Sequence, residues 1–151
     1  MNLQKRIYRY FYGLSCISFC IISIIIITRT FILKYRFSYL ILFLGIIQSI
    51  ISYLGDYYEY FDNINNNNNN NFYHYLDRII AIVTFIVSCL FVYNTKSKYK
   101  HDYYILLFIS FILWRIGQFC NKKKYKCWFI FHSFWHYIPV FAFCRLLLDL
   151  H

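Results

Sequence analysis

Two histidines four residues apart are the side chains of this sequence best suited to chemistry. His132 and His136 lie in the stretch FHSFWH, residues 131–136. At about 3.6 residues per turn, their imidazoles share one face of a helix, one turn apart. This spacing lets two histidines bind a single metal ion such as zinc. The alternative is that each ring forms a hydrogen bond with a neighbour near a membrane interface.

Further groups that would complete such a site stand at the ends of other apolar stretches. Asp56 closes one stretch, while His74 and Asp77 precede the next and are three residues apart. A carboxylate with two histidines and an open position for water is a typical catalytic zinc arrangement. A second carboxylate could orient a ligand or act as a base. The alternative is that Asp56 is a loop charge and Asp77 an acid favoured by a helix dipole.

Long apolar segments must position these residues. The chain has 151 residues, of which 60% are hydrophobic and 15% charged; an ordinary soluble domain has about 25% charged residues and is therefore excluded. A helix needs about 20 mainly apolar residues to cross a bilayer, where its backbone must satisfy its own hydrogen bonds. The sequence thus predicts an all-α, polytopic transmembrane helical bundle, a single domain over residues 1–151. Its five candidate spans are residues 10–28, 37–55, 79–95, 103–121 and 127–144.

Three features of these segments need interpretation. Residues 10–28 are interpreted as a retained span rather than a signal peptide, because no small-residue cleavage site follows them. Arg115 interrupts the fourth stretch, at an insertion cost of about 2.5–3.5 kcal/mol, so four spans with one interfacial helix is the alternative. The Asn-rich residues 62–72 are predicted to be a disordered loop.

With five spans, Asp56, Asp77 and the two histidines would lie on the same side of the membrane.

The charge of the chain points to membrane lipids rather than nucleic acid. Sixteen Lys and Arg against six Asp and Glu give a net charge of +10, but these cations lie between apolar stretches, as interface anchors do. The lysine-rich residues 122–126 either bind anionic lipid head groups or form a solvated loop. The six cysteines show no metal-site spacing and are interpreted as free thiols. The alternative is a Cys120–Cys127 bridge, if that loop faces an oxidising compartment.

The motif His132-Ser133-Phe134-Trp135-His136, together with Asp77 and Ser52, resembles the CREST superfamily of membrane hydrolases. That superfamily includes alkaline ceramidases, adiponectin-receptor-like proteins, post-GPI-attachment lipid remodelling proteins and myomaker relatives. The resemblance implies a zinc ion held by three histidines, with the serine and the aspartate beside it.

Two departures from the superfamily pattern stand out. Asp56 occupies the place of the third histidine, so either Asp56 or His74 would be the third ligand. The superfamily has seven spans rather than five, and the resemblance covers only residues 49–95 and 127–148.

The sequence therefore predicts a multi-pass integral membrane protein, in a membrane that it does not identify. The resemblance implies a zinc-dependent hydrolase of lipid amide or ester bonds, with Asp77 and Ser52 in catalysis. The metal ligands would be His132, His136 and either Asp56 or His74. The alternative is a non-catalytic assembly, fusion or scaffold protein whose polar residues form interhelical hydrogen bonds. A transporter or channel is the third and least favoured hypothesis, because five spans without a repeat leave little room for a transport pathway.

Overall fold

The computed structural model describes residues 3–58, 72–123, 125 and 127–150, with side chains from residue 9 onward except those of residues 56–58 and 74. This part of the chain is helical and contains no strand, which confirms the all-α prediction. The α-helices are α1 (Leu3–Ile17), α2 (Cys20–Thr28), α3 (Ser38–Ser52), α5 (Phe72–Asn94), α6 (Lys100–Lys122) and α7 (Trp128–Asp149). Two shorter elements flank α3: the 3-10 helix η1 (Thr30–Lys34) and the π-helix η2 (Tyr53–Tyr58).

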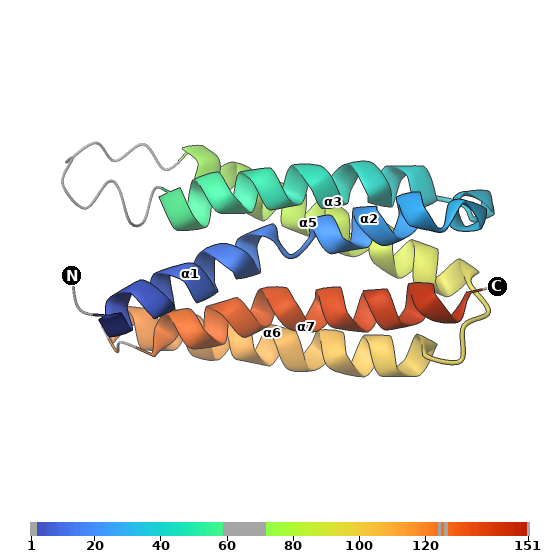
Figure 1. Ribbon diagram of the computed structural model, residues 1–151. Helices are drawn as coiled ribbons and strands as arrows, with labels where there is room; N and C mark the ends of the chain where they lie inside the picture. Colours follow the sequence, from blue (N-terminus) through green and yellow to red (C-terminus); the bar gives the residue numbers. More distant parts are fainter. Residues whose placement is uncertain (1–2, 59–71, 124, 126, 151) are drawn as a thin grey trace.

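The helices run roughly parallel and antiparallel in an elongated bundle (Figure 1). α3 packs on α5, and α6 packs on α7. α1 and α2 lie between these pairs, because α2 contacts α3 while both helices contact α7. The end of α3 and the starts of α5 and α7 lie at one end of the bundle, at the left of Figure 1. The antiparallel arrangement thus brings the candidate residues of three helices to the same end.

Apolar side chains cover the outside of the described bundle, while polar ones lie inside it. The exposed face of α6 carries Ile105, Phe108, Ile109, Phe111, Ile112, Ile116 and Phe119. The buried polar residues are Ser15, Ser18, Ser23, Ser38, Gln48, Ser49, Ser52, Asp77, Ser88, Thr95, Ser97, Ser110, Ser133 and His136. A helix on the surface of a soluble protein turns its polar face outward. The observed distribution is compatible with a bundle surrounded by lipid.

Among the described residues, three helices are long and apolar enough to cross a membrane, over Ser38–Gly55, Tyr75–Asn94 and Lys100–Lys122. A fourth span results if α1 and α2, bent by 43° at their junction, are one broken span. The predicted five spans are therefore not confirmed. The missing one is α7, which forms the expected helix but is not among the sufficiently apolar helices, since the histidines and Pro139 interrupt its apolar sequence.

The Arg115 segment, by contrast, passes this test. Arg115 lies exposed on the outside of α6, where its guanidinium donates to the Gln118 side chain over 3.2 Å. Its long side chain can therefore keep the charge away from the packed interior. The predicted span 103–121 therefore remains a candidate span.

The first apolar stretch is two helices instead of one straight span. The Ser15 hydroxyl donates to the Tyr12 carbonyl over 2.7 Å, and the Ser18 hydroxyl donates to the Ser15 carbonyl over 2.6 Å. Such bonds compete with the α-helical ladder and bend helices. The Ser18 amide accordingly donates three residues back, to the Ser15 carbonyl, over 3.2 Å. The bend carries Ser15 and its neighbours into the middle of the bundle.

Candidate functional site

Ser52 and Asp77 form a buried hydrogen-bonded pair between α3 and α5. The Ser52 hydroxyl donates to Oδ1 of Asp77. The side-chain nitrogen of Gln48 lies 2.8 Å from Ser52 Oγ and 2.8 Å from Asp77 Oδ1. A buried carboxylate is costly unless donors satisfy it. α3 provides two such donors because Gln48 and Ser52, four residues apart, share a helix face.

The two histidines form a second cluster on α7. Their ring centroids are 4.9 Å apart, and His136 is only 2% exposed. Aromatic rings surround the pair: Tyr12 of α1 lies 5.5 Å from His132, and Phe19 lies 5.6 Å from His136. The predicted placement on one helix face therefore holds.

A contact with α1 assigns the tautomer of His136. Ser15 Oγ lies 3.5 Å from His136 Nδ1 and gives its one proton to the Tyr12 carbonyl. The hydroxyl oxygen must then accept, so Nδ1 carries the proton and donates. This places the lone pair of His136 on Nε2. A metal-binding histidine is commonly held in this way, with its other ring nitrogen donating to a fixed acceptor.

The helix break between α1 and α2 lies next to both clusters. Ser49 of α3, one turn before Ser52, lies 3.2 Å from the Ile17 carbonyl and can donate to it. Ser15, two residues before Ile17, contacts His136 on α7. The break thus connects the helix of the serine–aspartate pair with the helix of the histidines. In Figure 1 this break lies about midway along the bundle, while α3 ends and α7 begins toward its left end.

Ser133 adds a polar atom beside the histidines. It is fully buried, and its Oγ is the one buried side-chain nitrogen or oxygen in the described part of the chain without a hydrogen-bond partner. A buried hydroxyl without a partner costs about 1–3 kcal/mol. Such a group is a candidate for contact with a bound molecule.

A complete metal-ligand set does not appear among the described side chains, where no three His, Cys, Asp or Glu residues lie close enough to share an ion. Asp77 is therefore held by α3 rather than grouped with the histidines. Asp56 in η2 and His74 in α5, the two candidates for the third ligand, have side chains outside the described ones. The donors present, two imidazoles that meet edge to face with one tautomer assigned, fit two positions of a zinc site.

Two residues that complete these clusters were missed in the sequence. Gln48 is a polar residue four positions before Ser52 within an apolar stretch, and that spacing was a usable signal. Ser15 gave no such signal, since 121 positions separate it from His136. Comparison of the chain with protein-family models, with curated proteins and with solved structures finds no match. The likeness to the CREST pattern therefore rests on the motif residues alone.

Proposed function

We propose that the protein is an integral membrane protein with five membrane segments, α7 being the fifth. The outward-facing apolar side chains and the buried polar ones support this proposal. α7 has 22 residues, a length of about 33 Å at the usual helical rise, which matches a hydrocarbon core of about 30 Å. It packs against α1, α2 and α6, so its histidines face protein rather than lipid.

We further propose that the two polar clusters belong to a zinc-dependent hydrolase that acts on amide or ester bonds of membrane lipids. The observation that carries this proposal is the edge-to-face pair of half-buried His132 and buried His136 on α7, in a bundle that also holds the buried Ser52–Asp77 pair. Nucleophile activation by zinc needs deprotonated nitrogen ligands and a nearby proton acceptor. The assigned tautomer of His136 and the Asp77 carboxylate are groups of these two kinds.

Each residue has a distinct role in this proposal. His132 and His136 would hold zinc together with Asp56 or His74, and Ser15 would fix the orientation of His136. Zinc, when bound, would lower the pKa of a water molecule to about 7. Asp77 would accept a proton from that water, while Ser52 and Gln48 hold the carboxylate in place through the bonds described above. Membrane lipid would thus surround the helices and also supply the substrate.

Metal content of the detergent-purified chain tests the proposal. We expect about one zinc per chain in the wild type and none in His132→Ala/His136→Ala. His101→Ala is the matched control, because His101 is exposed at the start of α6, at the other end of the bundle. Asp56→Asn and His74→Ala then separate the two candidates for the third ligand, since only the true ligand lowers zinc content. Absence of metal from the wild type would contradict the hydrolase proposal.

A non-catalytic membrane protein is the second candidate, and one observation favours it. Gln48, Ser52 and Asp77 satisfy one another across α3 and α5, as interhelical hydrogen bonds do in membrane bundles. On this hypothesis, the double histidine variant loses stability while metal content is zero in both proteins. The same measurement therefore decides between the two candidates.

A further inference from the structure

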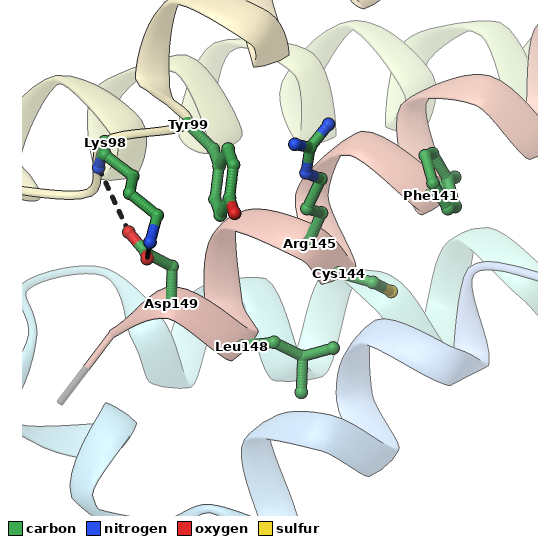
Figure 2. A pocket seen from close by; sticks show the side chains of 7 residues that line it. All are labelled: Lys98, Tyr99, Phe141, Cys144, Arg145, Leu148 and Asp149. Atoms are coloured by element: carbon green, nitrogen blue, oxygen red, sulfur yellow. Dashed lines mark hydrogen bonds and ion pairs between the residues drawn. The ribbon is translucent and has the colours of Figure 1, made fainter.

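A groove of about 550 Å³, within the volume range of ligand sites, opens where the loop between α5 and α6 meets the C-terminal part of α7. Its residues come from the loop between α5 and α6 and from the last turns of α7 (Figure 2). Phe141 and Leu148 are apolar and exposed, whereas Lys98 and Arg145 bring positive charge. The groove therefore has an apolar wall and a cationic wall.

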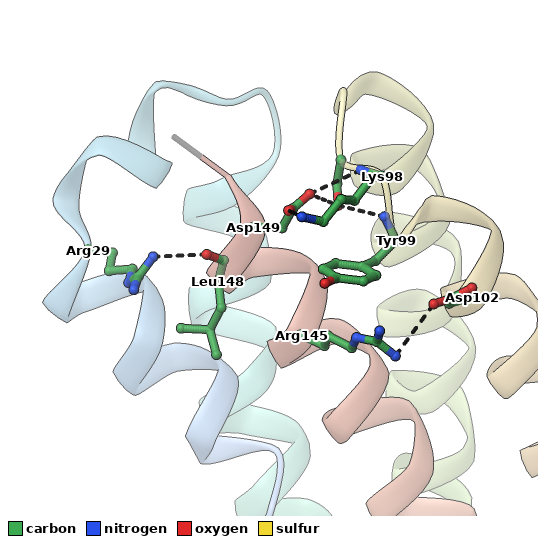
Figure 3. A network of polar contacts seen from close by, with 8 residues as sticks. Arg29, Lys98, Tyr99, Asp102, Arg145, Leu148 and Asp149 are labelled. Atoms are coloured by element: carbon green, nitrogen blue, oxygen red, sulfur yellow. Dashed lines mark hydrogen bonds and ion pairs between the residues drawn. The ribbon is translucent and has the colours of Figure 1, made fainter.

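Tyr99 holds both cations in place. The Arg145 guanidinium lies 4.0 Å from the centre of the Tyr99 ring, and the Lys98 ammonium lies 5.1 Å from it (Figure 3). Cation–π contacts of this kind orient a charge without neutralising it. Figures 2 and 3 show the Tyr99 ring between the two cations, so Lys98 and Arg145 lie on opposite sides of the ring along one groove.

The two nearby carboxylates are engaged to different degrees. Asp149 accepts from the Ser97 hydroxyl over 2.8 Å and from the Lys98 backbone over 3.0 Å, and its other oxygen lies 3.3 Å from the Lys98 ammonium. Asp102 contacts Arg145 through one atom pair at 3.4 Å, and both side chains are about half exposed. A guanidinium has five N–H donors. Arg145 can therefore bind a second anion while it keeps Asp102.

The surrounding end of the bundle is strongly basic. Among the described residues, seven Lys and Arg side chains lie at the ends of α2, α5 and α7 and the starts of α3 and α6, against Asp102 and Asp149 alone; they are Arg29, Lys34, Arg36, Lys96, Lys98, Lys100 and Arg145. Two of the candidate spans begin near these basic residues, at Ser38 and Lys100, and a third ends near them, at Asn94. Basic residues at the end of a membrane span attract anionic head groups.

We propose that this groove binds the head group of an anionic phospholipid. The phosphate would contact Arg145, with Lys98 on the other side of the Tyr99 ring adding electrostatic attraction, and the first part of an acyl chain would lie against Phe141 and Leu148. Charge complementarity and the apolar wall together favour a lipid over a free phosphate. The site rests on the proposed membrane location, but it is separate from the hydrolase centre, which lies at the other end of the bundle.

Binding of phosphatidylglycerol and phosphatidylcholine with identical acyl chains to the full-length, detergent-purified protein tests this proposal. We expect preferential binding of phosphatidylglycerol, weakened on the order of 10- to 30-fold in Lys98→Gln/Arg145→Gln. Lys34→Gln/Arg36→Gln removes the same charge at the same end but outside the groove, and should bind as the wild type does. Asp102→Asn removes a competing carboxylate and should bind phosphatidylglycerol more tightly, which guards against misfolding as the cause of a loss.

Three outcomes would overturn the lipid site: equal binding of both lipids, equal weakening by the control variant, or no gain in Asp102→Asn. Equal competition by glycerol phosphate, which lacks acyl chains, would identify a free phosphate ester as the occupant instead. Extraction of cell membranes with alkaline carbonate is run in parallel. Release of the protein there would contradict the membrane proposal itself, whereas retention with no lipid preference contradicts only the groove.

Discussion

The Ser15 hydroxyl lies 3.5 Å from Nδ1 of His136, across 121 positions of the chain. Since Ser15 already donates to the Tyr12 carbonyl, this contact sets which nitrogen of His136 carries the proton. A serine at the end of one helix thereby controls the candidate metal-binding atom of another.

Ser15→Ala should weaken zinc binding by about 10- to 100-fold without abolishing it, because loss of a group that orients a histidine ligand typically has this effect. Zinc affinity is measured by competition with a chelator. Ser18→Ala is the matched control, since the Ser18 hydroxyl donates to a backbone carbonyl in the same turn. Equal affinities of the two variants would show that Ser15 does not orient His136.

Ser52→Ala should lower the free energy of unfolding by about 1–3 kcal/mol, because it leaves Gln48 and Asp77 without a shared buried partner. Ser110→Ala provides the comparison. Ser110 is equally buried but donates to the Leu107 carbonyl of its own helix over 2.7 Å, so its loss should cost about 1 kcal/mol or less. Chemical unfolding in detergent measures both variants, and a larger cost at Ser110 would contradict this ranking.

Gly45→Ala should destabilise the bundle by about 1–3 kcal/mol through overpacking. A Cβ atom at Gly45 would lie 2.5 Å from Ser23 Oγ and 3.1 Å from the Phe19 carbonyl oxygen, where α2 crosses α3. At Gly117 the nearest atoms would be 3.4 Å away, and Gly117→Ala should be neutral or stabilising by up to about 1 kcal/mol. Thermal unfolding compares the two variants; similar melting temperatures would mean that α2 and α3 can separate at little cost.

The contact between the α5–α6 loop and the end of α7 should depend on pH. Hydrogen bonds from Ser97 and Lys98 lower the pKa of the Asp149 carboxyl, which lies beyond the apolar run 127–144. The hydrogen bond that the Lys98 ammonium donates to Asp149 raises the pKa of Lys98, and the nearby Tyr99 raises it further. The carboxylate thus stabilises the fold above its unfolded pKa of about 3.9, and this stability is lost as pH falls through its lower folded value. The ammonium stabilises the fold below about pH 10.4, and this stability is lost as pH rises through its higher folded value.

The measurement for this prediction is the unfolding midpoint of the wild type and of Asp149→Asn across the pH range. We expect a difference between them at neutral pH that disappears at acidic pH and becomes smaller at alkaline pH, where the Lys98 ammonium is lost but the hydrogen bonds from Ser97 and the Lys98 backbone remain. Ser110→Ala should show no such pH-dependent difference, because Ser110 does not titrate. A constant offset for Asp149→Asn from acidic to alkaline pH would contradict an electrostatic origin.

Much of the fold followed from where apolar runs start and stop. The predicted spans 79–95 and 103–121 fall in α5 and α6, apart from Thr95, which follows α5, because apolar runs of this length must satisfy their backbone as helices. The break at Ser18 was not predicted, since it depends on serine hydroxyls that bond to backbone carbonyls and not on composition. The cost of Arg115 within the predicted span 103–121 could not be judged from the sequence, because it depends on where the long side chain reaches.

The sequence by itself determined that His132 and His136 share a helix face and that Ser52 and Asp77 stand at neighbouring helix ends, because helical spacing is local. Only the tertiary structure decided that Asp77 bonds to Ser52 and Gln48, and that Ser15 meets His136. These contacts depend on which helices are neighbours and how each is rotated about its axis. Packing of all side chains in the bundle sets both at once, so no single stretch of residues encodes them.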